Sequence, residues 1–446
     1  MTRLANGDVR LRRVWQSIAN RGLQLLTRRN ASASGVTELA KELLSERGEA
    51  SGMALAIECI ERYRRLSAEA RRAFFLSLLD CDFLPDPNKV LSAAEKYRFA
   101  PNSGTLADLF NVVEPLRQEL FRRVNSAPGG TLALIRMRED LLRMLPEHPS
   151  LKPVDLDLRH LFSSWFNRGF LRIERIDWRT PAVVLEKLME HEAVHEISGW
   201  DDLRRRLLRD RRCFAFFHPA LPDQPLIFIE VALTRGLPSS IQELLDRSKE
   251  PLDPARADTA VFYSISNCLE GLRGIAFGNL LIKQVVTELE AEDLHVRTFV
   301  TLSPVPGFRN WLNGLNSDQL SEILHEMDAA TLDLIARPNW HTKPQIRDQV
   351  RPLLLRLCAY YLLVERKQGR ALDPVAAFHL GNGAAIDQMN WLADLSEKGL
   401  ARSLGIMVNY GYRPAQIERN HEAYIKHGRV AASSQVKALI GEASHK

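Results

Sequence analysis

The stretch Val261-Phe-Tyr-Ser-Ile-Ser-Asn-Cys-Leu-Glu-Gly-Leu-Arg-Gly-Ile-Ala-Phe-Gly278 decides the fold of the second half of this chain. Its first part is an apolar run with β-branched and aromatic side chains, which predicts a strand. Glycines at 271, 274 and 278 mark a loop. Apolar residues of the segment 279–290 then recur near helical spacing, at Leu281, Val285, Val286 and Leu289. The stretch therefore predicts a strand, a glycine-rich loop and a helix.

The loop could bind an anion, because glycines let successive backbone N–H groups converge at the positive end of a helix. The same glycines could also serve only as turn residues. The spacing Arg273-x-x-Ala276-x-Gly278 resembles the acyl-coenzyme A pyrophosphate loop of the GNAT acetyltransferase fold, with Ala276 in place of its usual glycine. The resemblance implies that the backbone of seven residues binds a pyrophosphate: Arg273, Gly274, Ile275, Ala276, Phe277, Gly278 and Asn279.

Strand-like segments lie on both sides of this stretch. Apolar runs predict strands at 170–177, 212–217, 226–232, 260–266 and 296–302. Helical patterns separate several of them, at 183–195, 240–246 and 277–290. Strands interleaved with helices indicate an α/β or α+β domain. A long helical insert (318–337 and 344–366, 318–366 in all) precedes two last predicted strands at 375–380 and 405–410.

The first third of the chain has helical periodicity throughout. Leu109, Val113, Leu116 and Leu120 fall on one stripe of an amphipathic helix. A similar stripe runs from residue 134 to 145, where Pro146 ends it, and the segments 53–66 and 71–79 behave alike. We therefore predict an all-α helical bundle over 1–165, followed by a second domain over 166–446.

Composition narrows the classes of function. A length of 446 residues favours two domains, and no apolar run approaches the roughly 18 residues of a membrane span. The net charge of +5 is too small for a typical nucleic-acid-binding protein and suits a polyanionic small molecule. Five scattered cysteines without a Cys-x-x-Cys pair indicate a reducing compartment. Seven arginines among the first thirty residues fit an organellar presequence or an amphipathic first helix, and we expect a cytoplasmic protein.

Two polar residues close apolar, strand-like segments. Ser303 follows such a run in Phe299-Val-Thr-Leu-Ser-Pro-Val-Pro-Gly-Phe308, and two prolines stiffen the turn after it. His379 ends the run 375–380 and precedes two glycines. A serine at a strand end often only hydrogen-bonds the turn, and an isolated histidine is usually structural. Both residues are nevertheless placed where a sheet could open onto a ligand.

Several motifs, taken in order, resemble one family. They are Phe170-Leu-Arg-Ile-Glu-Arg, Val231-Ala-Leu-Thr, Phe262-Tyr-Ser-Ile-Ser, Leu302-Ser-Pro-Val-Pro-Gly-Phe, Phe378-His-Leu-x-Asn-Gly and Asn390-Trp-Leu-Ala-Asp. Over most of 130–412 the chain is similar to the malonyl-CoA decarboxylase family. The resemblance implies an α+β protein, with a helical oligomerisation domain before an acetyltransferase-like mixed sheet. It also implies a homo-oligomer, a dimer or tetramer, that converts malonyl-CoA to acetyl-CoA and carbon dioxide.

The same resemblance assigns roles to the two polar residues. It implies that Ser303 acts on the malonyl carboxylate and that His379 protonates carbon. The enolate formed between these steps would be stabilised by a backbone N–H where the strands 261–266 and 296–302 splay apart. No metal, biotin, pyridoxal or thiamin cofactor is expected, because the thioester itself accepts the electrons. Coenzyme A is then part of the substrate.

Other interpretations stay open. An acyl-CoA-dependent acyltransferase would share the loop, and a non-catalytic protein could bind malonyl-CoA without consuming it. His191-Glu-Ala-Val-His195 matches the zinc hydrolase signature His-Glu-x-x-His, with Glu192 as its general base, but the third-ligand continuation is absent. We therefore expect no metal site. The run Arg204–Arg212 is interpreted as a solvated helix face, with phosphate contact as the alternative.

Overall fold

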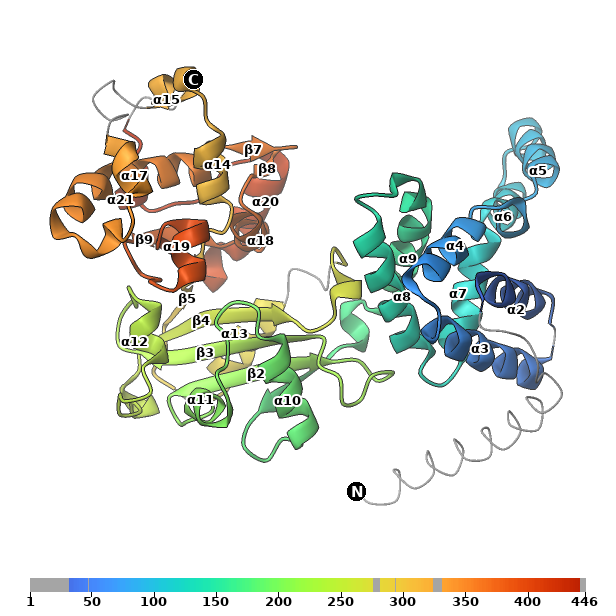
Figure 1. Ribbon diagram of the computed structural model, residues 1–446, viewed down its shortest axis with the longest axis horizontal. Helices are drawn as coiled ribbons and strands as arrows, with labels where there is room; N and C mark the ends of the chain where they lie inside the picture. The colour runs from blue at the N-terminus through green and yellow to red at the C-terminus, as the bar shows by residue number, and fades with distance from the viewer. Residues whose placement is uncertain (1–31, 47, 276–280, 293, 324–330, 442–446) are drawn as a thin grey trace. The chain divides into compact units, whose positions relative to one another are not determined.

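A computed structural model describes residues 32–46, 48–275, 281–292, 294–323 and 331–441 (Figure 1). The chain divides into two compact units. Of the described residues, those up to 171 belong to one unit together with the short segments 218–222 and 269–275, and the rest belong to the other. Among the described residues, no helix is both long and apolar enough to cross a bilayer.

The first unit is helical, as its periodicity predicts. Its helices are α2 (Ala33–Ser45), α3 (Glu49–Arg64), α4 (Ala68–Ser77), α5 (Pro87–Phe99), α6 (Ser103–Val113), α7 (Leu116–Ser126), α8 (Gly130–Met144) and α9 (Lys152–Trp165). Buried apolar side chains from α2, α3, α4, α7, α8 and α9 form its core. The prediction of an all-α first region is confirmed.

One helix of this region was predicted wrongly. The stripe from Leu109 to Leu120 spans two helices, because α6 ends at Val113 and α7 begins at Leu116. The break lies at Glu114, whose backbone is extended (φ −70°, ψ 128°). Its neighbour Pro115 explains this conformation, since the proline ring disfavours the helical region for the residue before it.

The second unit is built on a mixed sheet. Its strands are β1 (Arg172–Ile176), β2 (Arg211–Phe217), β3 (Ile227–Thr234), β4 (Thr259–Asn267), β5 (Thr298–Thr301), β6 (Ser303–Pro304), β9 (Ala385–Asn390) and β10 (Met407–Tyr412). The order is β1-β2-β3-β4-β5-β10-β6, and β9 also pairs with β10. Among these pairs β4 and β5 are parallel and the others antiparallel. The predicted α+β class and the five predicted strands between 170 and 302 are confirmed.

The two parallel strands separate where a site was expected. Their pairing runs from Thr259 opposite Thr298 to Phe262 opposite Thr301, and β4 then continues without β5 to Asn267. At the same point the register between β3 and β4 shifts, which leaves Tyr263 as an extra residue. Such a bulge bends a strand and is common beside active sites. The sheet is therefore open at the end of β5, directly before Ser303.

Helices of 5 to 20 residues complete this unit. They are α10 (Ala182–His191), α11 (Trp200–Arg206), α12 (Ile241–Leu245), α13 (Leu281–Glu290), α14 (Phe308–Gly314), α15 (Ser317–Ile323), α17 (Pro344–Leu363), α18 (Pro374–Gly381), α19 (Glu397–Ser403), α20 (Pro414–His427) and α21 (Ser434–Ala438). In Figure 1, α10 and α11 lie over the face of β2 and β3. Apolar side chains of α10, β2 and β3 form one buried cluster there. The described parts of the insert 318–366 are mainly helical, as predicted.

The segment 375–380 is a helix, α18, and the strand predicted there is wrong. A short apolar run does not distinguish a buried strand from a buried helix. The residues just before this run favour a helix over a strand. Asp373 caps the helix by accepting hydrogen bonds from the Val375 and Ala376 amides, and Pro374 occupies its first turn. Strand β9 was not predicted, whereas the segment 405–410 forms most of β10.

Candidate active site

Ser303 and His379 meet at the open end of the sheet. Ser303 begins β6 and His379 lies on α18, and Ser303 Oγ is 3.1 Å from His379 Nε2. Both side chains are buried, with exposed fractions of 7% and 3%. Two residues 76 positions apart in the chain are thus in hydrogen-bond contact.

The Ser303 hydroxyl is tied to the strand before it. Its Oγ donates a hydrogen bond to Thr301 Oγ1 at 2.9 Å. Thr301 Oγ1 also accepts from the backbone N–H of Tyr410 on β10, at 3.2 Å. Thr301 and Ser303 lie on the same side of the chain because side chains alternate along an extended segment. The serine oxygen therefore keeps a lone pair with which to accept a bond from His379.

Two tyrosines of β10 enclose the imidazole of His379. Nδ1 is 2.8 Å from the Tyr412 hydroxyl, and the ring stacks on Tyr410 with 4.6 Å between ring centroids. Burial lowers the pKa of His379 from its usual 6.5 to about 3, because the charged imidazolium cannot be solvated there. The ring is therefore neutral near neutral pH and carries one proton.

The hydrogen-bond directions place that proton. Since Ser303 donates to Thr301, the 3.1 Å contact requires His379 Nε2 to be the donor. Nδ1 then has no hydrogen and accepts from the Tyr412 hydroxyl. The resting site is a directed chain from Tyr412 through His379 and Ser303 to Thr301. It presents an imidazole N–H, a group that can give a proton to a reacting atom.

Sequence reasoning did not identify Thr301, Tyr410 or Tyr412 as site residues. A signal existed: Thr301 lies two positions before Ser303, and the tyrosines are two positions apart on one strand. What the sequence lacked was the pairing of β10 with β5 and β6, which brings the tyrosines to the serine. A buried amide pair supports that pairing, since Asn409 Nδ2 donates to the Thr301 carbonyl at 2.8 Å and Asn390 Nδ2 donates to Asn409 Oδ1 at 2.7 Å.

The predicted pyrophosphate loop is described only in part. Ala276, Phe277, Gly278 and Asn279 lie outside the described residues, so the structure describes Arg273, Gly274 and Ile275. These three belong to the helical unit, and Gly274 has a left-handed backbone, φ +77°. The Arg138 guanidinium of α8 donates to the carbonyls of Gly271 and Arg273 at 2.6 and 2.9 Å. A Cβ on Gly271 would lie 2.0 Å from the Ile135 carbonyl oxygen, so close packing on α8 requires this glycine.

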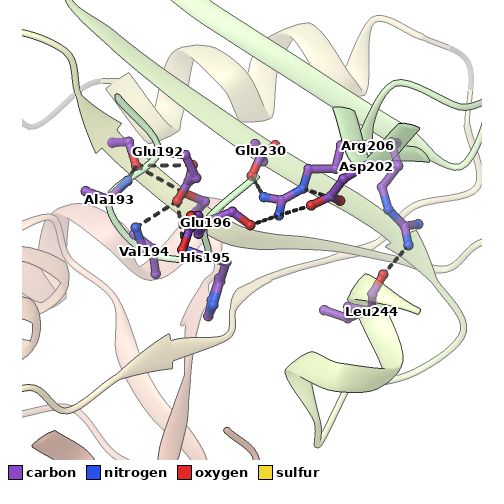
Figure 2. Close-up of polar contacts among 12 residues, drawn as sticks. Glu192, Ala193, Val194, His195, Glu196, Asp202, Arg206, Glu230 and Leu244 are labelled. Atoms are coloured by element: carbon purple, nitrogen blue, oxygen red, sulfur yellow. Dashed lines mark hydrogen bonds and ion pairs between the residues drawn. The ribbon is translucent and has the colours of Figure 1, made fainter. Parts of the chain in front are cut away.

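The zinc motif is not on one helix. Helix α10 ends at His191, and Glu192 has an extended backbone (φ −66°, ψ 106°), so His191 and His195 do not share a helical face. Figure 2 shows the Glu192 carboxylate turned toward the chain that follows it, where it accepts from the amides of Val194 and His195 at 2.8 and 2.9 Å. It also accepts from Ser264 Oγ at 2.7 Å. Among the described residues, no three His, Cys, Asp or Glu side chains are grouped to hold a metal ion.

The arginine run is not a solvated helix face, and this interpretation was wrong. Four of its six arginines are buried in ion pairs: Arg205 with Asp210, Arg206 with Asp202 and Glu230, Arg211 with Asp210, and Arg212 with Glu292. Figure 2 shows Arg206 between Asp202 and Glu230. Helix α11 ends at Arg206 and β2 begins at Arg211, so the run is divided between a helix and a buried strand and does not form one exposed helix face. They serve the fold of the sheet unit.

Comparison with known proteins gives consistent matches. The family model of the malonyl-CoA decarboxylase C-terminal domain matches residues 169–446, and that of the N-terminal domain matches 83–166. The chain is 37% identical to the mitochondrial malonyl-CoA decarboxylase of Anser anser anser over 420 residues, which cover 86% of this chain and 83% of the relative.

Solved structures agree over nearly the whole chain. The malonyl-CoA decarboxylase of Agrobacterium vitis is 50% identical with a TM-score of 0.87, covering 91% of this chain and 100% of the other. That of Rhodopseudomonas palustris is 48% identical with a TM-score of 0.86, covering 91% and 99%. With both domain models matched in order and the Ser303–His379 pair assembled, the chain belongs to the malonyl-CoA decarboxylase family.

Proposed function

We propose that this protein is a carboxy-lyase that converts malonyl-CoA to acetyl-CoA and carbon dioxide. The observation that supports this most directly is the buried Ser303–His379 contact, beside the point where β4 and β5 separate. A buried imidazole N–H next to a hydroxyl, where a sheet opens, suits a reaction that removes a carboxylate and then protonates carbon. The family to which the chain belongs supplies the substrate class.

The reaction begins with cleavage of the bond between the methylene carbon and the carboxylate. The electron pair of that bond passes into the thioester as an enolate, and carbon dioxide leaves. The Ser303 hydroxyl turns from Thr301 to the malonyl carboxylate and holds it away from water. Backbone N–H groups of β4 beyond Phe262, where β5 no longer pairs, stabilise the negative charge on the thioester oxygen.

Protonation of the enolate completes the reaction. The enolate carbon takes the proton from His379 Nε2, while the Tyr412 hydroxyl supplies a proton to Nδ1 at a distance of 2.8 Å. A proton from solvent then reaches Nε2 while Nδ1 returns its proton to the Tyr412 oxygen, which restores the resting arrangement. One proton is consumed overall, as the balance of malonyl-CoA against acetyl-CoA and carbon dioxide requires. The imidazole therefore relays a proton and stays neutral.

No metal or organic cofactor enters this proposal, because the thioester accepts the electron pair. Coenzyme A is part of the substrate, and we propose that its pyrophosphate binds the backbone of residues 273–279. The left-handed Gly274 supports this assignment, since such a residue directs neighbouring amides to one point. Turnover should survive prolonged dialysis against a chelator, and its loss with recovery on adding a metal would contradict the proposal.

The deciding experiment uses malonyl-CoA labelled at its free carboxylate. We expect the label to leave as carbon dioxide while acetyl-CoA accumulates in equal amount, and Ser303→Ala to lower kcat by about a hundredfold. Label transferred to an acceptor amine would indicate an acyltransferase. Tight binding without consumption would indicate a malonyl-CoA-binding protein, and either result would overturn the proposal.

We also propose that the protein is a homo-oligomer. The hairpin of α5 and α6 supports this, because it exposes large apolar side chains: Leu91, Phe99, Leu106, Phe110 and Val113. Phe99 is 92% exposed, and α6 buries none of its residues. Two such hairpins would form a four-helix bundle. Phe110→Asp should lower the molar mass in light scattering, and an unchanged mass would exclude this surface as the interface.

The cellular location is proposed to be the cytoplasm. The five scattered cysteines without a Cys-x-x-Cys pair support a reducing compartment. The goose relative is named as a mitochondrial protein, which makes import into an organelle the alternative. Recovery of the full chain in an organelle fraction after cell fractionation would overturn this part of the proposal.

A further inference from the structure

A single buried carboxylate connects the segments that carry Ser303 and His379. Asp373 has no exposed surface. Its Oδ1 accepts from the backbone N–H groups of Val375 and Ala376 at 2.9 and 3.0 Å, which caps the helix bearing His379. Its Oδ2 accepts from the Gly307 N–H at 3.0 Å, in the turn that follows Ser303.

We propose that Asp373 is a positioning residue that fixes the separation between Ser303 Oγ and His379 Nε2. This rests on the proposed function. Helix α18 is short, so its cap sets the position of its whole length, including His379 six residues later. The turn from Ser303 to Gly307 contains Pro304 and Pro306, so restraint at its far end is transmitted to Ser303.

The surroundings of Gly307 leave the turn little freedom to move. A Cβ at this position would lie 2.3 Å from the Tyr361 hydroxyl oxygen and 3.3 Å from Asp373 Oδ2. Within the same turn, the Val305 N–H donates to Ser403 Oγ at 3.1 Å. The Gly307 backbone is therefore confined between α17 on one side and the Asp373 carboxylate on the other.

The carboxylate fits this role because backbone amides are its partners. Burial raises the pKa of Asp373, and the amides of Ala376, Gly307 and Val375 oppose that shift. Both carboxylate oxygens are committed to hydrogen bonds with two separate segments. Asparagine has the same shape but only one acceptor oxygen, so it can keep the helix cap or the Gly307 bond, but not both.

Asp373→Asn tests the proposal. We expect kcat for malonyl-CoA to fall by about ten- to a hundredfold, because small displacements of catalytic groups are costly, while KM stays within about twofold. The matched control is Asp86→Asn: Asp86 also caps a helix and also precedes a proline, but among the described residues its carboxylate accepts hydrogen bonds only from Asn88 and Lys89 of that helix. The Asp86→Asn variant should have the same kcat as the wild type.

These results separate the two proposals. A wild-type protein that forms no acetyl-CoA contradicts the proposed function, whatever the variants do. An active wild type with unchanged kcat in Asp373→Asn overturns the positioning role. An equal fall of kcat in Asp86→Asn would also overturn it, because loss of any helix cap would then have the same effect.

If Asp373→Asn does not fold, a second pair of variants tests whether the position of the turn from Ser303 to Gly307 controls kcat. Gly307→Ala places a methyl group against the Tyr361 hydroxyl and should displace the turn, lowering kcat with little change in KM. Adding Tyr361→Phe removes that oxygen, and the next contacts, at 3.3 and 3.4 Å, are tolerable. We expect the double variant to recover most of the lost kcat. A double variant as slow as Gly307→Ala would overturn the proposal.

Discussion

His379 is a buried histidine that the folded protein keeps uncharged. A solvated histidine changes charge near pH 6.5, but burial lowers the pKa of this ring to about 3. Its single proton lies on Nε2 because Ser303 donates its own hydrogen to Thr301. The protonation state of this residue therefore follows from two hydrogen-bond directions and from the burial of the ring.

Replacing this histidine should remove the proton donor. We expect His379→Gln to lower kcat by about a hundredfold or more, since general acids typically contribute that much. His195→Gln is the matched control, because His195 is also buried with its pKa lowered to about 4 and has no contact with Ser303 in the structure. Steady-state decarboxylation assays would compare them. Wild-type-like turnover in His379→Gln would exclude the assignment.

The pH profile of the wild type provides a second check. His379 is neutral throughout pH 5–8 because its pKa lies near 3, so its titration should leave no inflection in log kcat/KM over that range. An inflection near pH 6.5 that disappears in His379→Gln would show that the ring is solvated in the free enzyme, contrary to the structure.

Tyr412 should act through the histidine. Tyr412→Phe removes the donor at Nδ1, so the ring proton can occupy either nitrogen. Loss of a hydrogen bond worth about 1 kcal/mol would by itself lower kcat about fivefold, and we expect a larger fall because Tyr412 also supplies the proton to Nδ1 in the proposed mechanism. Tyr63→Phe removes another buried tyrosine hydroxyl, bonded to Asp140 in the helical unit, and should leave kcat unchanged. Equal turnover in both variants would contradict the role of Tyr412.

At the scale of elements, the segment after α10 supports β4 where that strand lacks β5. Glu192 accepts from the hydroxyls of Ser264 and Ser266, which lie just beyond the bulge at Tyr263. The Ala193 N–H donates to Ser266 Oγ at 3.1 Å. Side-chain contacts thus fix a strand that has lost its neighbour on one edge. Glu192, which suggested the general base of a zinc site, thus supports the sheet instead.

Glu192→Gln should weaken this contact. The amide offers one acceptor oxygen where the carboxylate offers two, so buried donors lose a partner, at a cost of about 1–3 kcal/mol in the free energy of unfolding. Glu196→Gln is the control from the same loop: Glu196 is exposed and meets Arg206 through its backbone carbonyl. Urea unfolding would compare them. Equal stabilities would show that the Glu192 contacts contribute nothing.

At the scale of the whole molecule, burial of neutral histidines makes stability depend on pH. The folded state keeps His379 and His195 neutral down to about pH 3 and 4, whereas the unfolded chain protonates them below about 6.5. The unfolded state then binds more protons, so the free energy of unfolding falls as pH falls from 6.5 toward those values. Above pH 6.5 neither residue contributes to the slope.

The expected loss is measurable. Between pH 7.5 and 5 each histidine should lower the free energy of unfolding by up to about 2 kcal/mol, since one pKa unit corresponds to about 1.4 kcal/mol. Urea unfolding at both pH values, on wild type and His379→Gln, isolates the contribution of one ring. The variant should lose less stability than the wild type on acidification. Identical losses would mean that His379 is protonated in the folded state.

The sequence by itself determined those features that depend on neighbours along the chain. Apolar periodicity located the helices of the first third, and the first five strands followed from short apolar runs. The motifs around Ser303 and His379 indicated the family and the two residues. The sequence also contained local signals that would have corrected two wrong predictions. Pro115 indicates a break in the helix predicted through Leu109 to Leu120, and the pair Asp373-Pro374 indicates a helix start where a strand was predicted.

Only the tertiary structure decided what those residues do together. The His379–Ser303 contact needs α18 to pack beside β6, and the Tyr412 contact needs β10 to pair with β5 and β6. Such pairings join positions far apart in sequence, and no local propensity encodes them, because their free energy comes from burial and hydrogen bonding in the complete sheet. The same holds for Asp373, whose hydrogen bond to Gly307 spans 66 positions. Sequence thus indicated two candidate side chains, Ser303 and His379, and the packing of the sheet unit set their distance, the position of the ring proton and the pKa of the histidine.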